Sequence, residues 1–132
     1  MATTTATITL SSTDLLTDSL SLTSTQTLYN NPDFCNGLAR KKITSTAIGT
    51  TSGQVILYTA DDMTPGTTAY IYIKNLSTTS TDYVFVYTGS ANILKMAGGD
   101  WALLPWNASD NSLSAWAVTN PTSVEFMVIG TE

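Results

Sequence analysis

The sequence predicts an all-β protein, built as an antiparallel β-sandwich of the jelly-roll type or as a flattened barrel, with an extended arm at its N-terminus. Short segments rich in Val, Ile, Thr and aromatic residues recur at regular intervals. Turn sequences such as Gly98-Gly99-Asp100 separate them. No segment keeps an apolar period of 3.6 residues over two turns, so helix is expected for at most a turn or two.

Residues 1–30 form the predicted arm or hairpin, and residues 31–132 form the predicted body. Thr5 to Leu10 alternates with period two and predicts a strand. Ser11 to Leu16 fits one short helical turn. A second strand starts at Ser19 and fades into a polar run that ends at Leu28, and the turn sequence at 30–33 marks the boundary with the body.

The body is predicted to contain eight strands, because turn-forming residues divide it into short segments. In the Gly-Gly-Asp-Trp phrase, Gly98-Gly99 predicts a tight turn, Trp101 begins a strand that enters the core, and Pro105 ends it at a sheet edge. The predicted strands cover residues 39–47, 53–59, 68–76, 82–88, 91–96, 100–105, 113–118 and 122–130.

Two of these strands are apolar on both faces. In the segment 69–73, Tyr70 and Tyr72 share one face while Ala and Ile residues share the other. In the segment 83–87, Tyr83, Phe85 and Tyr87 share a face opposite two valines. A strand with one face in water alternates apolar with polar residues. We therefore expect the aromatic faces to be covered by the arm, another sheet or a second subunit.

The composition favours protein–protein contact. At 132 residues, 42% of them hydrophobic, the chain suits one domain or one domain with an arm. Only 11% of residues are charged, whereas 25 are Thr and 14 are Ser. Because a hydroxyl that finds a partner is much cheaper to bury than a charge, such a surface is easily dehydrated.

The charge balance argues against nucleic acid as a partner. The net charge is −5, and three of the five basic residues are adjacent, at 40–42. No apolar window is long enough for a membrane-spanning helix, and the first residues lack the pattern of a secretory signal. The single Cys35 cannot form an internal disulfide, which favours synthesis in a reducing cytoplasm.

The sequence predicts no enzymatic activity, no cofactor and no metal. It contains no His, which excludes His-dependent nucleophilic catalysis and His-ligated metal sites. Asp61 and Asp62 are the densest carboxylate pair, but neighbours in a strand point to opposite sides. We interpret them as a solvated turn, with a weak Ca²⁺ site or an interface salt bridge as alternatives.

Basic and aromatic side chains are the candidate interface residues. The basic run 40–42 fits protection of a sheet edge or a contact between subunits. The aromatic residues fit a core or interface role, with a stacking platform for sugars as an alternative. The candidates are Ile8, Leu10, Arg40, Lys41, Lys42, Tyr70, Tyr72, Tyr83, Phe85, Tyr87, Trp101, Trp106 and Trp116.

Two stretches carry a resemblance to a known class of protein. One is the opening of residues 1–10 with the following 12–16; the other is 98–106, together with the terminal strand ending at 129–132. They resemble small β-rich virion structural proteins of tailed phages, particularly phages of cyanobacteria and other marine bacteria. The resemblance supplies no catalytic residues. Jelly-roll enzymes of the cupin type carry His metal ligands, which this chain lacks.

The resemblance implies a structural role in a virion, after synthesis in the host cytoplasm. We expect a capsid decoration or cement protein that stabilises the head by bridging capsid subunits. Its partners would be the major capsid protein and copies of itself, with a homotrimer as one arrangement. The alternatives are a tail, neck or baseplate component, or a glycan-binding module of a receptor-binding fibre.

Overall fold

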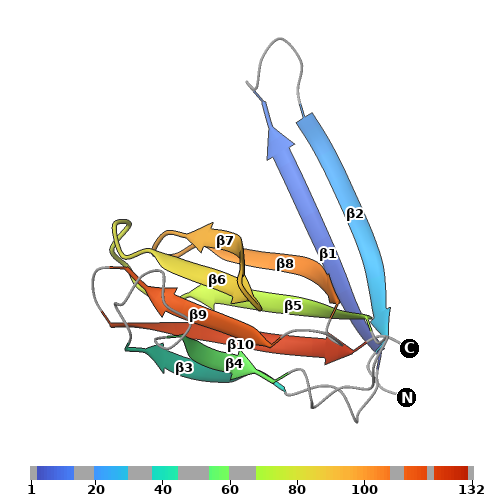
Figure 1. The fold of residues 1–132 in the computed structure, drawn as a ribbon. Helices are drawn as coiled ribbons and strands as arrows, with labels where there is room; N and C mark the ends of the chain where they lie inside the picture. The colour runs from blue at the N-terminus through green and yellow to red at the C-terminus, as the bar shows by residue number, and fades with distance from the viewer. Residues whose placement is uncertain are drawn as a thin grey trace.

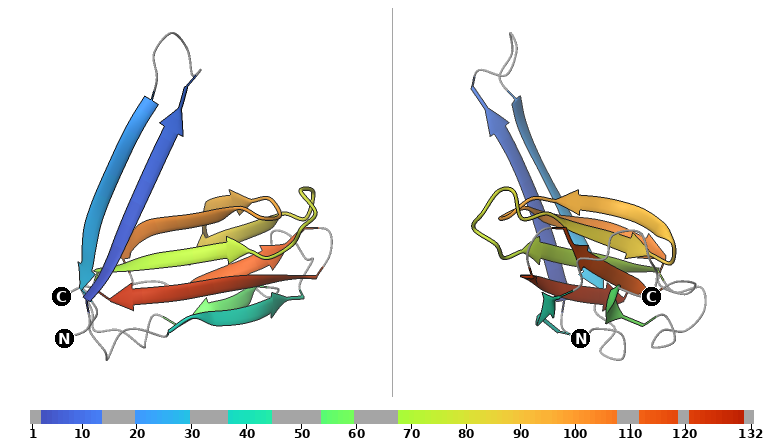
Figure 2. Two further views of the ribbon diagram at one scale, coloured as in Figure 1. Left: turned by 180° about the vertical axis from the view of Figure 1, so that it is seen from behind. Right: turned by 60° about the vertical axis from the view of Figure 1, so that its left-hand side comes forward.

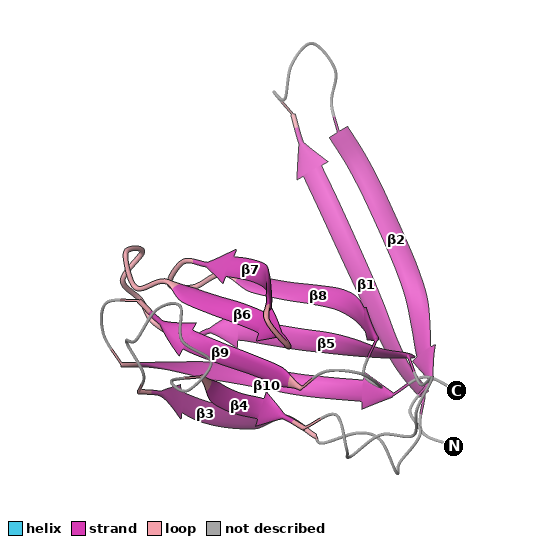
Figure 3. Cartoon of the chain, in the orientation of Figure 1, coloured by secondary structure: helices cyan, strands magenta, loops and turns pink. Residues whose placement is uncertain are grey.

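The computed structural model describes residues 3–13, 20–29, 37–44, 54–59, 68–107, 112–118 and 121–130. Within these ranges every regular element is a β-strand (Figure 3). The prediction of an all-β, antiparallel sandwich is therefore confirmed, and the flattened barrel is wrong because the sheets do not close on themselves.

Two strands form a hairpin that stands apart from the rest of the protein. They are β1 (Thr3–Ser12) and β2 (Leu20–Tyr29), which pair antiparallel in continuous register as a two-stranded sheet. The hairpin projects from one end of the sandwich, and its tip lies far from the other strands in all views (Figures 1 and 2). We call β1 and β2 the hairpin and the remaining strands the body.

Eight strands in two sheets make up the body. One sheet has the order β3 (Ala39–Ile43), β10 (Thr122–Gly130), β5 (Thr68–Asn75) and β8 (Trp101–Asn107). The other has the order β4 (Val55–Tyr58), β9 (Leu113–Ala117), β6 (Val84–Thr88) and β7 (Ala91–Met96). We call these the first sheet and the second sheet.

The chain crosses repeatedly between the two sheets. Apart from the consecutive pair β6 and β7, each successive strand from β3 to β10 lies in the sheet opposite its predecessor. All described pairs are antiparallel. This strand order is that of an eight-stranded jelly roll. Because that fold hosts many functions, it does not by itself identify one.

The core lies between the sheets and follows the period-two pattern of the sequence. Ile71 and Ile73 of β5 and Val84 and Val86 of β6 are completely buried, whereas the aromatic residues between them face outward. Each buried Ile or Val of this kind contributes roughly 1.5–3 kcal/mol through removal of apolar surface from water. The predicted division of faces in these two strands is confirmed.

Several predicted boundaries differ from the structure for identifiable reasons. Strand β8 continues past Pro105 to Asn107, because the missing N–H of proline costs no ladder hydrogen bond on the exposed side of an edge strand. Strand β1 continues to Ser12, where a helical turn was expected, and β2 continues through its polar residues to Tyr29. Cross-strand pairing keeps these polar segments extended. Residues 14–19 and the turn predicted at 30–33 lie outside the described ranges.

Candidate interaction surfaces

The hairpin has two chemically different faces. One face carries Ala6, Ile8, Leu10 and Leu22, and we call it the apolar stripe. Ile8, Leu10 and Leu22 are exposed, the last two by 50% each. Neither β1 nor β2 contains a charged residue. An exposed apolar row without charged neighbours is typical of a surface that another chain covers.

The opposite face of the hairpin consists of hydroxyl side chains in facing pairs. Thr7 Oγ1 and Thr25 Oγ1 are 3.1 Å apart, and Thr9 Oγ1 and Thr23 Oγ1 are 3.5 Å apart. Cross-strand Thr pairs of this kind contribute roughly 0.2–1 kcal/mol each. They help to hold the register of a ribbon that has no core of its own.

The hairpin joins the body through its second strand. Leu28 is only 2% exposed, and β2 contacts β10 in this region. Gln26 Nε2 donates a hydrogen bond of 2.5 Å to the hydroxyl of Tyr70 on β5. The arm thus reaches one of the aromatic residues of the first sheet, and one large apolar side chain is buried at its root.

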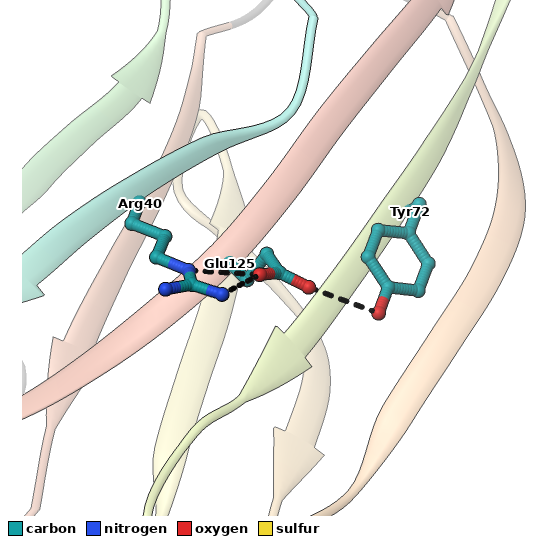
Figure 4. Close-up of polar contacts among 3 residues, drawn as sticks. All are labelled: Arg40, Tyr72 and Glu125. Carbon is teal, nitrogen blue, oxygen red and sulfur yellow. Dashed lines mark hydrogen bonds and ion pairs between the residues drawn. The ribbon is translucent and has the colours of Figure 1, made fainter.

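On the outer face of the first sheet, Glu125 links Arg40 to Tyr72 (Figure 4). Glu125 Oε2 accepts hydrogen bonds from Arg40 Nε at 2.9 Å and Arg40 Nη2 at 2.8 Å, and the Tyr72 hydroxyl donates to Oε1 at 3.4 Å. The Glu125 side chain is 12% exposed and that of Arg40 is 71% exposed. Burial, followed by the negative charge of Glu125 and its hydrogen bond, raises the pKa of Tyr72 above its ordinary value of 10.0.

The three basic residues of β3 behave differently from one another. Arg40 forms the ion pair with Glu125, and Lys42 is exposed. Lys41 lies on the core side of β3, in register with Val124, and its Nζ donates a hydrogen bond of 2.5 Å to the carbonyl oxygen of Ile56 on β4. Lys41 therefore connects the edge strands of the two sheets.

The aromatic candidates do not form one platform. Tyr70, Tyr72 and Trp101 lie on the outer face of the first sheet, and Trp101 is 59% exposed. The register places Trp101 opposite Lys74 and sends the next residue, Ala102, toward the core. The expectation that Trp101 itself enters the core is therefore wrong.

A second aromatic group covers the outer face of the second sheet. The Trp116 ring packs on Tyr87 with centroids 4.4 Å apart, while Lys95 Nζ lies 4.3 Å from the Tyr83 centroid and 5.8 Å from that of Phe85. Trp116 is only 3% exposed, and its buried Nε1 has no hydrogen-bond partner. Its ring has too little exposed surface to stack on a ligand.

Trp106 belongs to the core of the body. It is buried, packs edge-on against Tyr58 with centroids 6.1 Å apart, and donates from Nε1 to Thr88 Oγ1 at 3.1 Å. An indole whose N–H is satisfied inside the domain is a structural residue. Of the three tryptophans, only Trp101 presents its ring to a partner.

A buried asparagine joins two loops at the end of the body. Asn75 Nδ2 donates to the carbonyl oxygens of Asp82 at 2.7 Å and Met96 at 3.3 Å. Its Oδ1 accepts from Ser77 N at 3.1 Å and Thr122 Oγ1 at 3.3 Å. We call these four contacts the Asn75 cluster. The side chain uses its full hydrogen-bonding capacity there, which makes it a structural centre.

The loop beside this cluster depends on two glycines. Gly99 has φ of 88°, which favours glycine, and a Cβ on Gly98 would lie 2.2 Å from the carbonyl oxygen of Thr79. The predicted Gly-Gly turn is thus confirmed. Sequence reasoning missed Asn75, whose only signal is an amide at the end of an apolar strand.

Within the described ranges, no three Asp, Glu or Cys residues come together in a group that could hold a metal ion. Asp61, Asp62 and Cys35 lie outside those ranges. The part of the chain that the structure describes also contains no helix that could cross a lipid bilayer.

The chain matches no known protein-family profile, and no similar sequence is found among curated proteins.

Proposed function

We propose that this chain is a non-enzymatic structural protein of a tailed-phage virion, and more specifically a decoration protein on the outside of the capsid. The hairpin is the observation that supports this proposal most. It carries an exposed apolar stripe without charged residues away from a body that has its own complete core. A protein that bridges capsid subunits needs such an arm to reach a neighbour.

The body supports the same proposal. Its exposed surface includes Trp101, a large aromatic ring at the edge of the first sheet. Aromatic residues of this kind are enriched where protein surfaces meet. The body would rest on one capsid subunit while the hairpin contacts the next.

The copy number on purified particles tests the proposal. Isotope-labelled peptides of this chain and of the major capsid protein would be quantified together by mass spectrometry. We expect a copy number of the same order as that of the major capsid protein. A much lower number would indicate a tail, neck or baseplate component instead. Absence from purified particles would show that the virion assignment is wrong.

A glycan-binding module is the second candidate, and the exposure of Trp101 favours it. A sugar ring would stack on this indole, so Trp101→Ala would abolish binding on a glycan array. Trp106→Phe, inside the core, serves as the matched control because it leaves the outer face unchanged. If the wild-type protein binds no glycan on the array, this second candidate is wrong.

A further inference from the structure

The four edge strands of the body all carry features that discourage pairing with another chain. Strand β3 has three consecutive basic residues, and β8 has Pro105. The four-residue β4 shifts register between Ile56 and Tyr58. The pairing of β7 with β6 also shifts register, and β7 carries Lys95. Positive charge, proline and bulges are the means by which natural sheets avoid edge-to-edge association.

The two edges of the hairpin have none of these features. Strands β1 and β2 contain no charged residue and no proline, and their ten residue pairs run without a register shift. Among the described residues, no strand pairs with the outer side of either one. Each outer side therefore presents a row of backbone donors and acceptors to a further strand.

The side chains specify what kind of strand fits there. An added strand must continue the hydroxyl face on one side and the apolar stripe on the other, so it must be uncharged and alternate hydroxyl with apolar residues. The strands of the hairpin themselves meet this requirement: Thr7 and Thr9 alternate with Ile8 and Leu10. Threonine also pairs well with threonine across strands.

From this match we propose that the hairpin of one copy pairs edge to edge with the hairpin of a second copy, as neighbouring antiparallel strands of one sheet. A two-fold axis would place the same strand of each copy at the junction, which closes the contact. An isolated two-stranded hairpin is marginally stable, whereas three or more strands with an apolar face are stable. Pairing also brings the two apolar stripes side by side. This inference does not depend on the virion assignment.

Charge at the edge tests the pairing. Thr5→Lys with Thr9→Lys alters β1, and Thr23→Lys with Thr27→Lys alters β2; all four positions are exposed. The control, Thr44→Lys with Asn92→Lys, adds the same charge at exposed positions of the body. Light scattering after size-exclusion chromatography would give the mass of the full chain at rising concentration. We expect the wild type and the control to associate and at least one hairpin variant to be monomeric.

Hydrogen exchange locates the contact and guards against a variant that merely loses the hairpin. In the wild type, amides of residues 3–12 or 20–29 should become more protected as concentration rises, while those of the body stay unchanged. Leu10→Ser should weaken association, whereas Ile56→Ser, at a position of equal 50% exposure on β4, should not. A wild type that is monomeric at all concentrations, or protection that rises only in the body, would overturn the proposal.

Discussion

The hairpin and the body follow opposite rules within one chain. All charged residues that the structure describes lie in the body, where they protect edges, bond loops or pair with one another. The hairpin contains none and leaves apolar side chains in contact with water. The body is thus organised to remain a separate folded unit, and the hairpin is organised to be covered. Four changes would break or sharpen this contrast.

The largest expected effect is in the body, at the Asn75 cluster. Asn75→Leu would leave two carbonyl oxygens, one amide and one hydroxyl without their partner in a buried setting. Because each orphaned group costs about 1–3 kcal/mol, we expect the free energy of unfolding to fall by about 4 kcal/mol. Urea denaturation measures it, with exposed Asn92→Leu as the control. A loss below about 1 kcal/mol would show that the two loops are held by other contacts.

Removal of the hairpin should have a smaller effect on the fold than on assembly. Deletion of residues 1–30 exposes the surface that Leu28 covers, so we expect a loss of about 2 kcal/mol in the free energy of unfolding. The body should keep its β-type circular dichroism spectrum, and occupancy on particles should fall. Leu28→Ala in the full chain is the control and should reproduce most of the stability loss. An unfolded truncation would mean that the hairpin is an integral part of the body.

The two lysines of β3 provide a matched pair. Lys41→Met removes the hydrogen bond that connects β3 to Ile56 on β4, and we expect it to cost about 1 kcal/mol. Lys42→Met removes the same charge from an exposed side chain of the same strand and should cost less than about 0.5 kcal/mol. Denaturation at low and high salt would be compared. Equal losses for both variants would reduce the role of Lys41 to its charge alone.

The smallest effect concerns Tyr72 at alkaline pH. Its pKa is raised in the folded protein by burial, by the charge of Glu125 and by the hydrogen bond to it. The stabilisation is fully present below the unfolded value of 10.0 and is lost as the pH rises through the folded value. The difference in urea midpoint between wild type and Tyr72→Phe should therefore shrink above pH 10.0. A difference that stays constant with pH would contradict the link to ionisation.

Local patterns predicted much of the fold. Alternation of apolar residues gave the inward and outward faces of β5 and β6, and turn residues placed the strands of the body within a few residues. Strand order did not follow from the sequence, because pairs such as β3 with β10 join segments at opposite ends of the body. Local patterns contain no information on such long-range pairing.

The candidate interface residues were predictable as residue types but not as surfaces. Trp101 and Trp106 look alike in sequence, yet their odd spacing along β8 sends one outward and the other into the core. The direction of that alternation depends on register, which the partner strand sets. For the same reason Lys41, in a run that reads as an exposed edge, crosses between the sheets instead.

The length of the hairpin has a mechanical consequence. Strands of ten residues, at about 3.3 Å per residue, reach roughly 30 Å from root to tip. A neighbour held near Leu10 or Leu22 is therefore kept a domain's width away from the sandwich, and both ends of the molecule can be occupied at once. Because the ribbon is a single layer thick, a slight flex at Leu28 becomes a large sweep at the tip, and one chain can span gaps of different widths between the neighbours it joins.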